Sequence, residues 1–181
     1  MKSQLNALAL SIACLALASM VSLSAFARGD KDKDAGDKEV ARNTAWEALK
    51  TLEGTWAMNH PGPDGKIGEL VFKSTGNGSV VTETMFPGSK HEMVNMYHMD
   101  NDRLIMTHYC AMGVQPRMKL VGHENGVLKF EFVDITNAKP NEGYMSGLEM
   151  TINGEQLIEK WSYTKDGKVG EATEFELTKK Q

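Results

Sequence analysis

The sequence predicts an all-β fold, an antiparallel up-and-down meander of about ten strands that closes into a barrel. From Gly54 onward, turn-forming residues recur at intervals of roughly eight to twelve residues, with apolar and β-branched runs between them. These runs do not alternate with long helical segments, which argues against a parallel α/β sheet. Because closure removes exposed sheet edges, we favour a barrel over a two-layer sandwich.

The first 27 residues have the pattern of a signal peptide. Lys2 supplies a positive start, residues 8–23 form an apolar run, and Ala25-Phe26-Ala27 is a small-x-small cleavage site. Serines interrupt the apolar run, and a charged stretch follows it, so a membrane span is disfavoured. We therefore expect export to the periplasm or the extracellular space, without membrane insertion after the signal is removed.

A charged linker and a short helix are expected next. Residues 28–38 lack large apolar side chains and should form a disordered linker. Residues 39–52 have helical periodicity, and Gly54 ends the helix. The apolar residues along one side of this helix are Val40, Trp46, Leu49 and Leu52. Residues 39–181 would then form a single domain of helix plus barrel.

The clearest later strands come from runs with strand periodicity. These runs are residues 69–74, 80–86, 128–133, 148–152 and 157–164. A two-residue turn at Asn153-Gly154 would place Leu148 opposite Glu159 and Met150 opposite Leu157. A three-residue loop at 165–167 would add Thr173, Phe175 and Leu177 to the same face. Glu159 is the one residue that conflicts with an apolar interior.

The hairpin of residues 91–118 holds most of the candidate binding residues. It contains His91, His98 and His108, six methionines, and the one thiol beyond residue 27. Pairing Met99 with Leu104 places two sets of side chains on the face that we expect to be interior. These are His91, Met93, Asn95, Tyr97 and Met99, with Leu104, Met106, His108 and Cys110. The residues that we expect to bind a ligand are His91, Asn95, Tyr97, Met106, His108, Cys110 and Arg117.

Arg117 is included because of the loop in which we expect it. Residues 115–117 follow Gly113 and resemble a loop at the barrel mouth. A guanidinium there could bind a ligand's carboxylate through two hydrogen bonds. A plain turn with a solvated Arg117 is the equally weighted alternative.

Other chemistry has weaker support. His108 and Cys110, with neighbouring methionines, are ligand types for a soft metal, but compact metal-binding spacing is missing. The same pair lacks an identifiable oxyanion hole, and an inert buried thiol is the favoured interpretation of Cys110. Glu83, Glu92 and Glu159 could supply a carboxylate pair, although exposure on the sheet surface is the default. We expect no enzyme activity, metal or cofactor.

Composition narrows the possible partners. The chain has 24 acidic against 20 basic residues, a formal net charge of −4. Nucleic acid and anionic membrane surfaces need a basic face, so neither is an expected partner. With one cysteine beyond the signal segment, an internal disulfide is impossible and the core must stabilise the fold.

Two stretches resemble known proteins. Leu52-Glu53-Gly54-Thr55-Trp56 resembles the Gly-x-Trp opening of the calycins, the lipocalin and fatty-acid-binding group of barrels. Residues 87–118 are similar to an uncharacterised family of secreted bacterial lipocalin-like proteins. The resemblance implies a barrel with an internal cavity. Where lipocalins pack an Arg from the last strand across this Trp, the present chain offers only Lys179 and Lys180. It also lacks a C-terminal histidine for nitrobindin-like haem ligation.

These observations favour a secreted barrel that binds a small, largely apolar molecule in its interior. The alternative is a non-enzymatic structural or interaction module whose side chains fill the barrel. A metal-binding or haem-binding protein that uses His108 and Cys110 is less favoured.

The signal-peptide interpretation predicts a mature chain that begins at or near Arg28, because the cleavage site precedes this residue. Amino-terminal sequencing of protein from the exported fraction should find this start. A chain that keeps Met1 and stays in the cytoplasm would refute the prediction.

Overall fold

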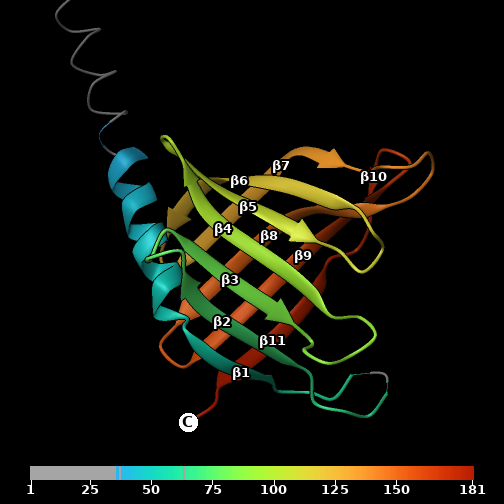
Figure 1. Cartoon of the computed structure of the whole chain (residues 1–181), viewed down its shortest axis with the longest axis horizontal. Helices are drawn as coiled ribbons and strands as arrows, with labels where there is room; N and C mark the ends of the chain where they lie inside the picture. The colour runs from blue at the N-terminus through green and yellow to red at the C-terminus, as the bar shows by residue number, and fades with distance from the viewer. Residues whose placement is uncertain (1–35, 37, 63) are drawn as a thin grey trace, which may run out of the picture. The chain divides into compact units, whose positions relative to one another are not determined.

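A computed structural model describes residues 36, 38–62 and 64–181 of the chain. Residues 41–181 form one compact unit, a closed antiparallel barrel of ten strands with one short helix (Figure 1). The expected all-β barrel is therefore confirmed. The expected signal peptide and most of the expected linker lie outside the described residues.

The helix covers residues 38–51, within one residue of the expected limits. In its part within the barrel unit, Ala45 and Leu49 are fully buried, as is Leu52 just after it, and all three belong to the barrel core. Gly54 has a φ of 125°, a backbone conformation that L side chains rarely adopt, so glycine fits the turn from helix to sheet.

Among the described residues, eleven strands follow the helix in sequence, and ten of them form the closed ring. They are β1 (Gly54–Met58), β2 (Glu69–Thr75), β3 (Val80–Met85), β4 (Met93–Asp100), β5 (Arg103–Tyr109), β6 (Gln115–Glu124), β7 (Val127–Thr136), β8 (Tyr144–Asn153), β9 (Gln156–Lys165), β10 (Lys168–Val169) and β11 (Thr173–Lys179). Neighbours in sequence pair from β1 to β9, and β11 pairs with both β9 and β1. The two-residue β10 pairs only with the end of β9.

The two ends of the barrel differ. Tight turns connect the strands at the end where the helix lies, and Asn77, Asn101 and Asn125 there adopt positive φ. At this end the Thr44 side chain hydrogen-bonds to His123 at 3.1 Å. The opposite end has the longer connections, residues 59–68, 86–92, 110–114 and 137–143. The helix therefore closes one end and leaves the other to these loops.

The interior face of the 91–118 hairpin is the expected one. Met99 pairs with Leu104, and Tyr97 pairs with Met106, as the alternation predicts. Tyr97 and Met106 are fully buried, whereas Met96 is 37 % exposed. Because side chains alternate across a strand, this register settles which face of β4 and β5 lines the barrel.

The predicted register of the β8–β9 hairpin is wrong by two residues. Asn153 pairs with Gln156, so the turn residues are Gly154 and Glu155. Gly154 has a φ of 59° at the first turn position, which is typical of a type II′ hairpin, whereas an Asn-Gly turn needs positive φ at Asn153. A shift of two residues leaves Leu148, Met150 and Leu157 on their predicted face, whereas a bulge between Met145 and Gly147 interrupts the alternation further along β8.

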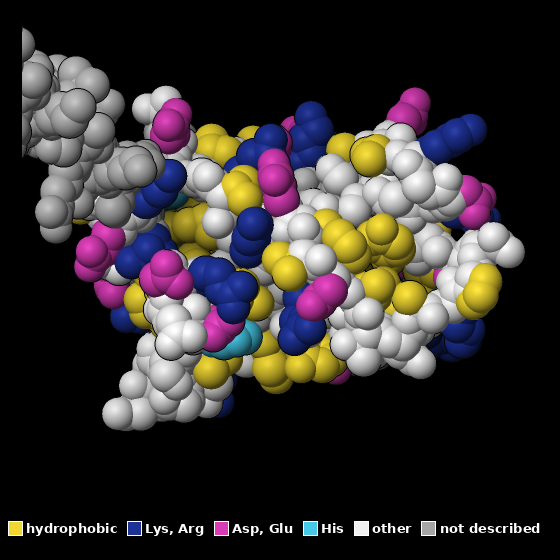
Figure 2. All heavy atoms as spheres, turned by 90° about the horizontal axis from the view of Figure 1, so that it is seen from above, with side chains coloured by type: hydrophobic (Ala, Val, Ile, Leu, Met, Phe, Trp, Pro, Cys, Tyr) yellow, Lys and Arg dark blue, Asp and Glu magenta, His cyan; other side chains and the backbone are white. Residues whose placement is uncertain are grey.

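The surface carries both charge signs. Figure 2 shows one face of the molecule, on which Lys and Arg side chains are interspersed with Asp and Glu. Ion pairs such as Lys129–Glu149 and Lys180–Glu69 join neighbouring positions on the outside of the barrel. Exposed pairs of this kind add little stability, so the core carries most of it.

Trp56 connects the end of the helix with the first and last strands of the barrel. The side chain is 1 % exposed, and its Nε1 donates a hydrogen bond to the Leu52 carbonyl oxygen at 2.7 Å. Lys179 on β11 pairs with Trp56, and its Nζ lies 5.5 Å from the Trp56 ring centroid. The same Nζ donates to the Thr51 carbonyl oxygen at 3.1 Å, so a lysine takes the place over the ring expected of a lipocalin arginine.

Replacing Trp56 by Ala should lower the free energy of unfolding by about 3–5 kcal/mol, because it opens a large cavity in the core. Urea unfolding of the two proteins checks this value. Trp46→Ala is the matched control, since Trp46 is only partly buried on the helix and should cost less. A loss below about 1 kcal/mol for Trp56→Ala would contradict the assigned role.

Candidate functional site

A cluster of polar side chains lies inside the barrel, where an all-apolar core would be the simplest arrangement. We call it the interior polar cluster. Its members, each 1 % exposed or less, are Glu83, Asn95, Tyr97, His108, Glu159 and Trp161. Because buried polar groups are costly unless they are hydrogen-bonded, the contacts among these residues decide what the site can do.

Strand alternation brings the members together. Glu83 on β3 pairs with Asn95 on β4, which pairs in turn with His108 on β5, so the three side chains enter the barrel side by side. Glu159 and Trp161 are successive inward positions on β9, across the lumen from that group. The rings of His108 and Trp161 lie 5.0 Å apart between centroids.

Glu83 accepts two short hydrogen bonds on one carboxyl oxygen. The Tyr97 hydroxyl donates to Glu83 Oε2 at 2.7 Å, and Asn95 Nδ2 donates to the same atom at 2.8 Å. Across the lumen, Trp161 Nε1 donates to Glu159 Oε2 at 3.0 Å. The two carboxyl groups also lie close enough to hydrogen-bond to each other when one of them carries a proton.

Burial favours a proton on the glutamate pair. It raises the pKa of Glu159 well above 4.5, and the negative charge of Glu83 raises that pKa further. Burial also raises the pKa of Glu83, to about 7, although the hydrogen bonds from Asn95, Tyr97 and Glu159 lower it. Near neutral pH the pair therefore carries at most about one negative charge.

His108 is neutral and has one free acceptor. Burial lowers its pKa to about 4. Its Nδ1 lies 2.6 Å from Asn95 Oδ1. Because the Asn95 amide nitrogen already donates to Glu83, Oδ1 must accept and His108 Nδ1 must donate. Nε2 is then the unprotonated nitrogen, and this buried atom has no hydrogen-bond partner within the part of the chain that the structure describes.

A groove opens at the loop end of the barrel. Its volume is about 960 Å³, and its lining includes Met58, Ile67, Phe86, Lys90, His91 and Phe175. We call it the mouth groove. The rings of Phe86 and Phe175 meet edge to face, with centroids 5.7 Å apart. Phe86 has a φ of 55°, an unusual conformation for a bulky residue, and such strain is often found at functional sites.

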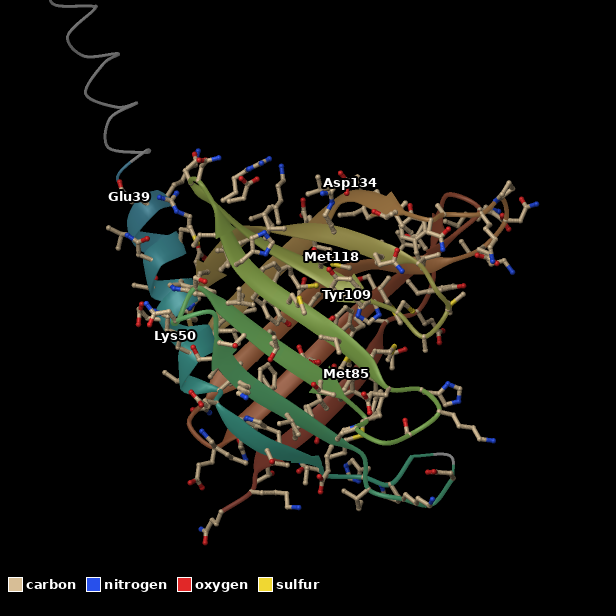
Figure 3. All side chains as sticks on the ribbon, viewed as in Figure 1. Glu39, Lys50, Met85, Tyr109, Met118 and Asp134 are labelled. Atoms are coloured by element: carbon tan, nitrogen blue, oxygen red, sulfur yellow. The ribbon has the colours of Figure 1, made fainter. Side chains whose placement is uncertain are left out.

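The mouth groove lies next to the interior polar cluster. Phe175 on β11 pairs with Glu159 on β9, so a groove residue stands directly beside a cluster residue. On β3, Met85 is the next inward side chain after Glu83 towards the loops. Its sulfur lies 3.5 Å from Asn95 Nδ2. Met85 is marked in Figure 3, on the strand that leads to the loop end.

The structure brings together four of the seven expected binding residues and separates three. Asn95, Tyr97, Met106 and His108 are all buried inside the barrel. His91 is exposed in the loop before β4 and lines the mouth groove. Cys110 is partly buried just after β5.

The expected loop at residues 115–117 is wrong, because these residues begin β6. Pro116 and Met118 are buried, so the intervening Arg117 faces outward. There it forms an ion pair with Asp134 on β7. Figure 3 labels Asp134 at the edge of the barrel. Arg117 is therefore not placed at the barrel mouth.

Sequence reasoning missed the two buried glutamates as a pair. The expectation that these glutamates lie exposed on the sheet surface is wrong for Glu83 and Glu159, which are fully buried. It is correct for Glu92, which is exposed. Signals existed for both: Glu159 already faced the apolar side of its predicted hairpin, and Glu83 lies between the inward residues Val81 and Met85. Their contact across the lumen needs the closed barrel and could not be derived from one hairpin.

Within the described part of the chain, no group of three or more His, Cys, Asp or Glu side chains is arranged to hold a metal ion. None of the helices described there is both long and apolar enough to cross a membrane. The sequence matches no protein-family model and no curated protein. The closed ten-strand antiparallel barrel with its single described helix is consistent with a calycin-like barrel.

The glutamate pair predicts that stability falls as pH rises. The folded-state pKa of Glu83 and Glu159 lies above 4.5, so the folded chain binds more protons than the unfolded chain above that pH. His108, with its lowered pKa, acts in the opposite direction, but only below about 6.5.

Glu159→Gln keeps the carboxyl shape without the titration. Between about pH 6.5 and pH 9 it should lose less stability than the wild type, by on the order of 2 kcal/mol. Urea unfolding at several pH values measures this. Glu131→Gln, at an exposed position on β7, should behave as the wild type. Parallel pH profiles for wild type and Glu159→Gln would show that the pair is not titrating.

Proposed function

We propose that this protein is a secreted, non-enzymatic carrier that binds a small, largely apolar molecule in its barrel. The observation that supports this most directly is the mouth groove, about 960 Å³ in volume. Binding sites for small molecules typically have volumes of about 300–1,000 Å³ and mostly apolar linings. Met58, Ile67, Phe86 and Phe175 supply the apolar part of the lining here, and Asp64, Lys66, Glu69 and Lys90 add charged groups.

The direction of entry follows from the two ends of the barrel. The helix closes one end with Ala45 and Leu49 in the core, so a ligand would enter at the loop end. The loops of residues 59–68 and 86–92 border the groove. Methionine side chains are flexible, so Met58 can adapt to ligands of different shape.

Export is part of the proposal. The signal-peptide pattern of residues 1–27 supports it. The resemblance to secreted lipocalin-like proteins and the calycin-like barrel support a lipocalin-type carrier role, in the periplasm or outside the cell.

Binding is favoured over glycoside hydrolysis by the contact between the carboxyl groups. Retaining and inverting glycosidases hold their two carboxyl groups about 5 Å or more apart, with the sugar between them. The carboxyl groups of Glu83 and Glu159 lie within hydrogen-bonding range of each other, too close for a sugar between them. The pair is better suited to contacting a bound group than to cleaving a bond.

The second candidate is a structural or interaction module with a self-filled barrel. Its support is the packing of the interior, where Tyr97, Phe130 and Trp161 are almost completely buried. The Tyr97 and Phe130 rings pack edge to face, 5.8 Å apart. Such a module would bind no apolar molecule, which separates it from a carrier.

Diphenylhexatriene, an uncharged hydrocarbon dye, should bind the purified mature protein and fluoresce. Ile67→Lys should weaken binding by about threefold or more, because it puts a charge in the groove lining. Ile158→Lys is the matched control, since Ile158 lies on the outer face of β9 and is also exposed. Fluorescence titration measures both.

A wild-type protein that does not bind the dye would favour the self-filled module. Equal weakening by the two substitutions would place the dye outside the mouth groove.

A further inference from the structure

The interior polar cluster has more hydrogen-bond acceptors than donors. Tyr97, Asn95 and Trp161 each already donate to a carboxyl oxygen. Apart from a proton between the two glutamates, no donor among the described residues reaches Glu83 Oε1 or Glu159 Oε1. His108 Nε2 is a third buried acceptor, and it too has no partner among these residues. An unpaired buried acceptor is unfavourable, so the cluster is suited to a group that donates hydrogen bonds.

The charges inside the barrel also favour a ligand group that donates hydrogen bonds. Among the described residues, the buried charged or titratable side chains of the barrel interior are Glu83, His108 and Glu159, and no lysine or arginine is fully buried there. A ligand carboxylate would meet two carboxyl groups without a cation. A ligand with a cationic head group would supply the positive charge that the barrel interior lacks.

The mouth groove gives an apolar tail a place beside this cluster. Phe175 lines the groove and pairs with Glu159. Met85 separates Glu83 from the loop end and touches Asn95 through its sulfur. Rotation of this flexible side chain would connect groove and cluster without moving a strand.

We propose, on the premise that the barrel is a carrier of apolar molecules, that its ligand is an apolar primary amine. The ammonium group binds against the Glu83–Glu159 pair, on the side of His108 Nε2, and its three N–H donors reach towards the unpaired acceptors there. Glu83 binds it as a carboxylate, and any proton that Glu83 carries passes to solvent. Glu159 keeps its proton, so one positive and one negative charge meet in the interior. The alkyl part occupies the mouth groove.

Displacement of bound diphenylhexatriene tests the head group. Decylamine, decanol and decanoate have the same tail, and at about pH 7 they are cationic, neutral and anionic. Decylamine should displace the dye at a concentration about tenfold lower than either of the others. Equal or better displacement by decanol or decanoate overturns the amine proposal while leaving the carrier function intact. A failure of the dye itself to bind overturns the carrier function and the amine proposal together.

The double variant Glu83→Gln, Glu159→Gln tests the residues. It keeps the shape of both side chains and removes both acids, so it should still bind the dye but should lose the preference for decylamine. The exposed Glu131→Gln should keep the preference. A double variant that binds the dye and still prefers decylamine overturns the assignment of these residues.

Proton release on ligand binding is measured on the wild type alone. It therefore tests the proposal even if the double variant does not fold. Calorimetry of decylamine binding in buffers of different ionisation enthalpy should show close to one proton released near pH 6. The number should fall towards zero near pH 8, because Glu83, with a pKa of about 7, is then already ionised. Decylamine binding without proton release near pH 6 overturns the proposal.

Discussion

The pairing of β11 with both β9 and β1 is the constraint on which the rest of the structure depends. Leu177 stands opposite Leu157 on one side and Met58 on the other, so the last strand completes the ring. Without it, β1 and β9 would be exposed sheet edges, and the interior would be one face of an open sheet. Closure also places strands that are distant in sequence across a shared lumen. Each inward side chain then has partners that its own hairpin does not contain.

The interior polar cluster is a direct consequence of that closure. Glu83 and Glu159 come from opposite sides of the barrel, and each would have a different role on an open sheet. Inside the lumen they share a proton, and their remaining oxygens accept bonds from Tyr97, Asn95 and Trp161. The network satisfies most but not all of its polar atoms. A fully satisfied network would serve rigidity alone, and the unpartnered His108 Nε2 distinguishes this one.

The sequence was sufficient for the elements and their faces, because alternation within a hairpin is a local property. The helix limits, the Met99–Leu104 pairing and the inward set Asn95, Tyr97 and His108 follow from it. The register of β8 against β9 depends on which two residues form the turn. The sequence around Asn153 and Gly154 allows more than one choice. Arg117 was misplaced because Gly113 and Pro116 suggested a loop, although β6 begins between them. The glutamate pair depends on contacts between β3 and β9, which no local pattern encodes.

The contact of Lys179 with Trp56 also bears on how the chain folds. The helix end, the first strand and the last strand meet at this side chain, and nearby Thr178 and Asn59, which hydrogen-bond to each other, are 119 residues apart in sequence. Contacts between such distant segments form late, because the entropy of closing so long a loop must be overcome first. The ring cannot close before β11 pairs with β1 and β9. Until then the unpaired edges of β1 and β9 are the segments most exposed to aggregation.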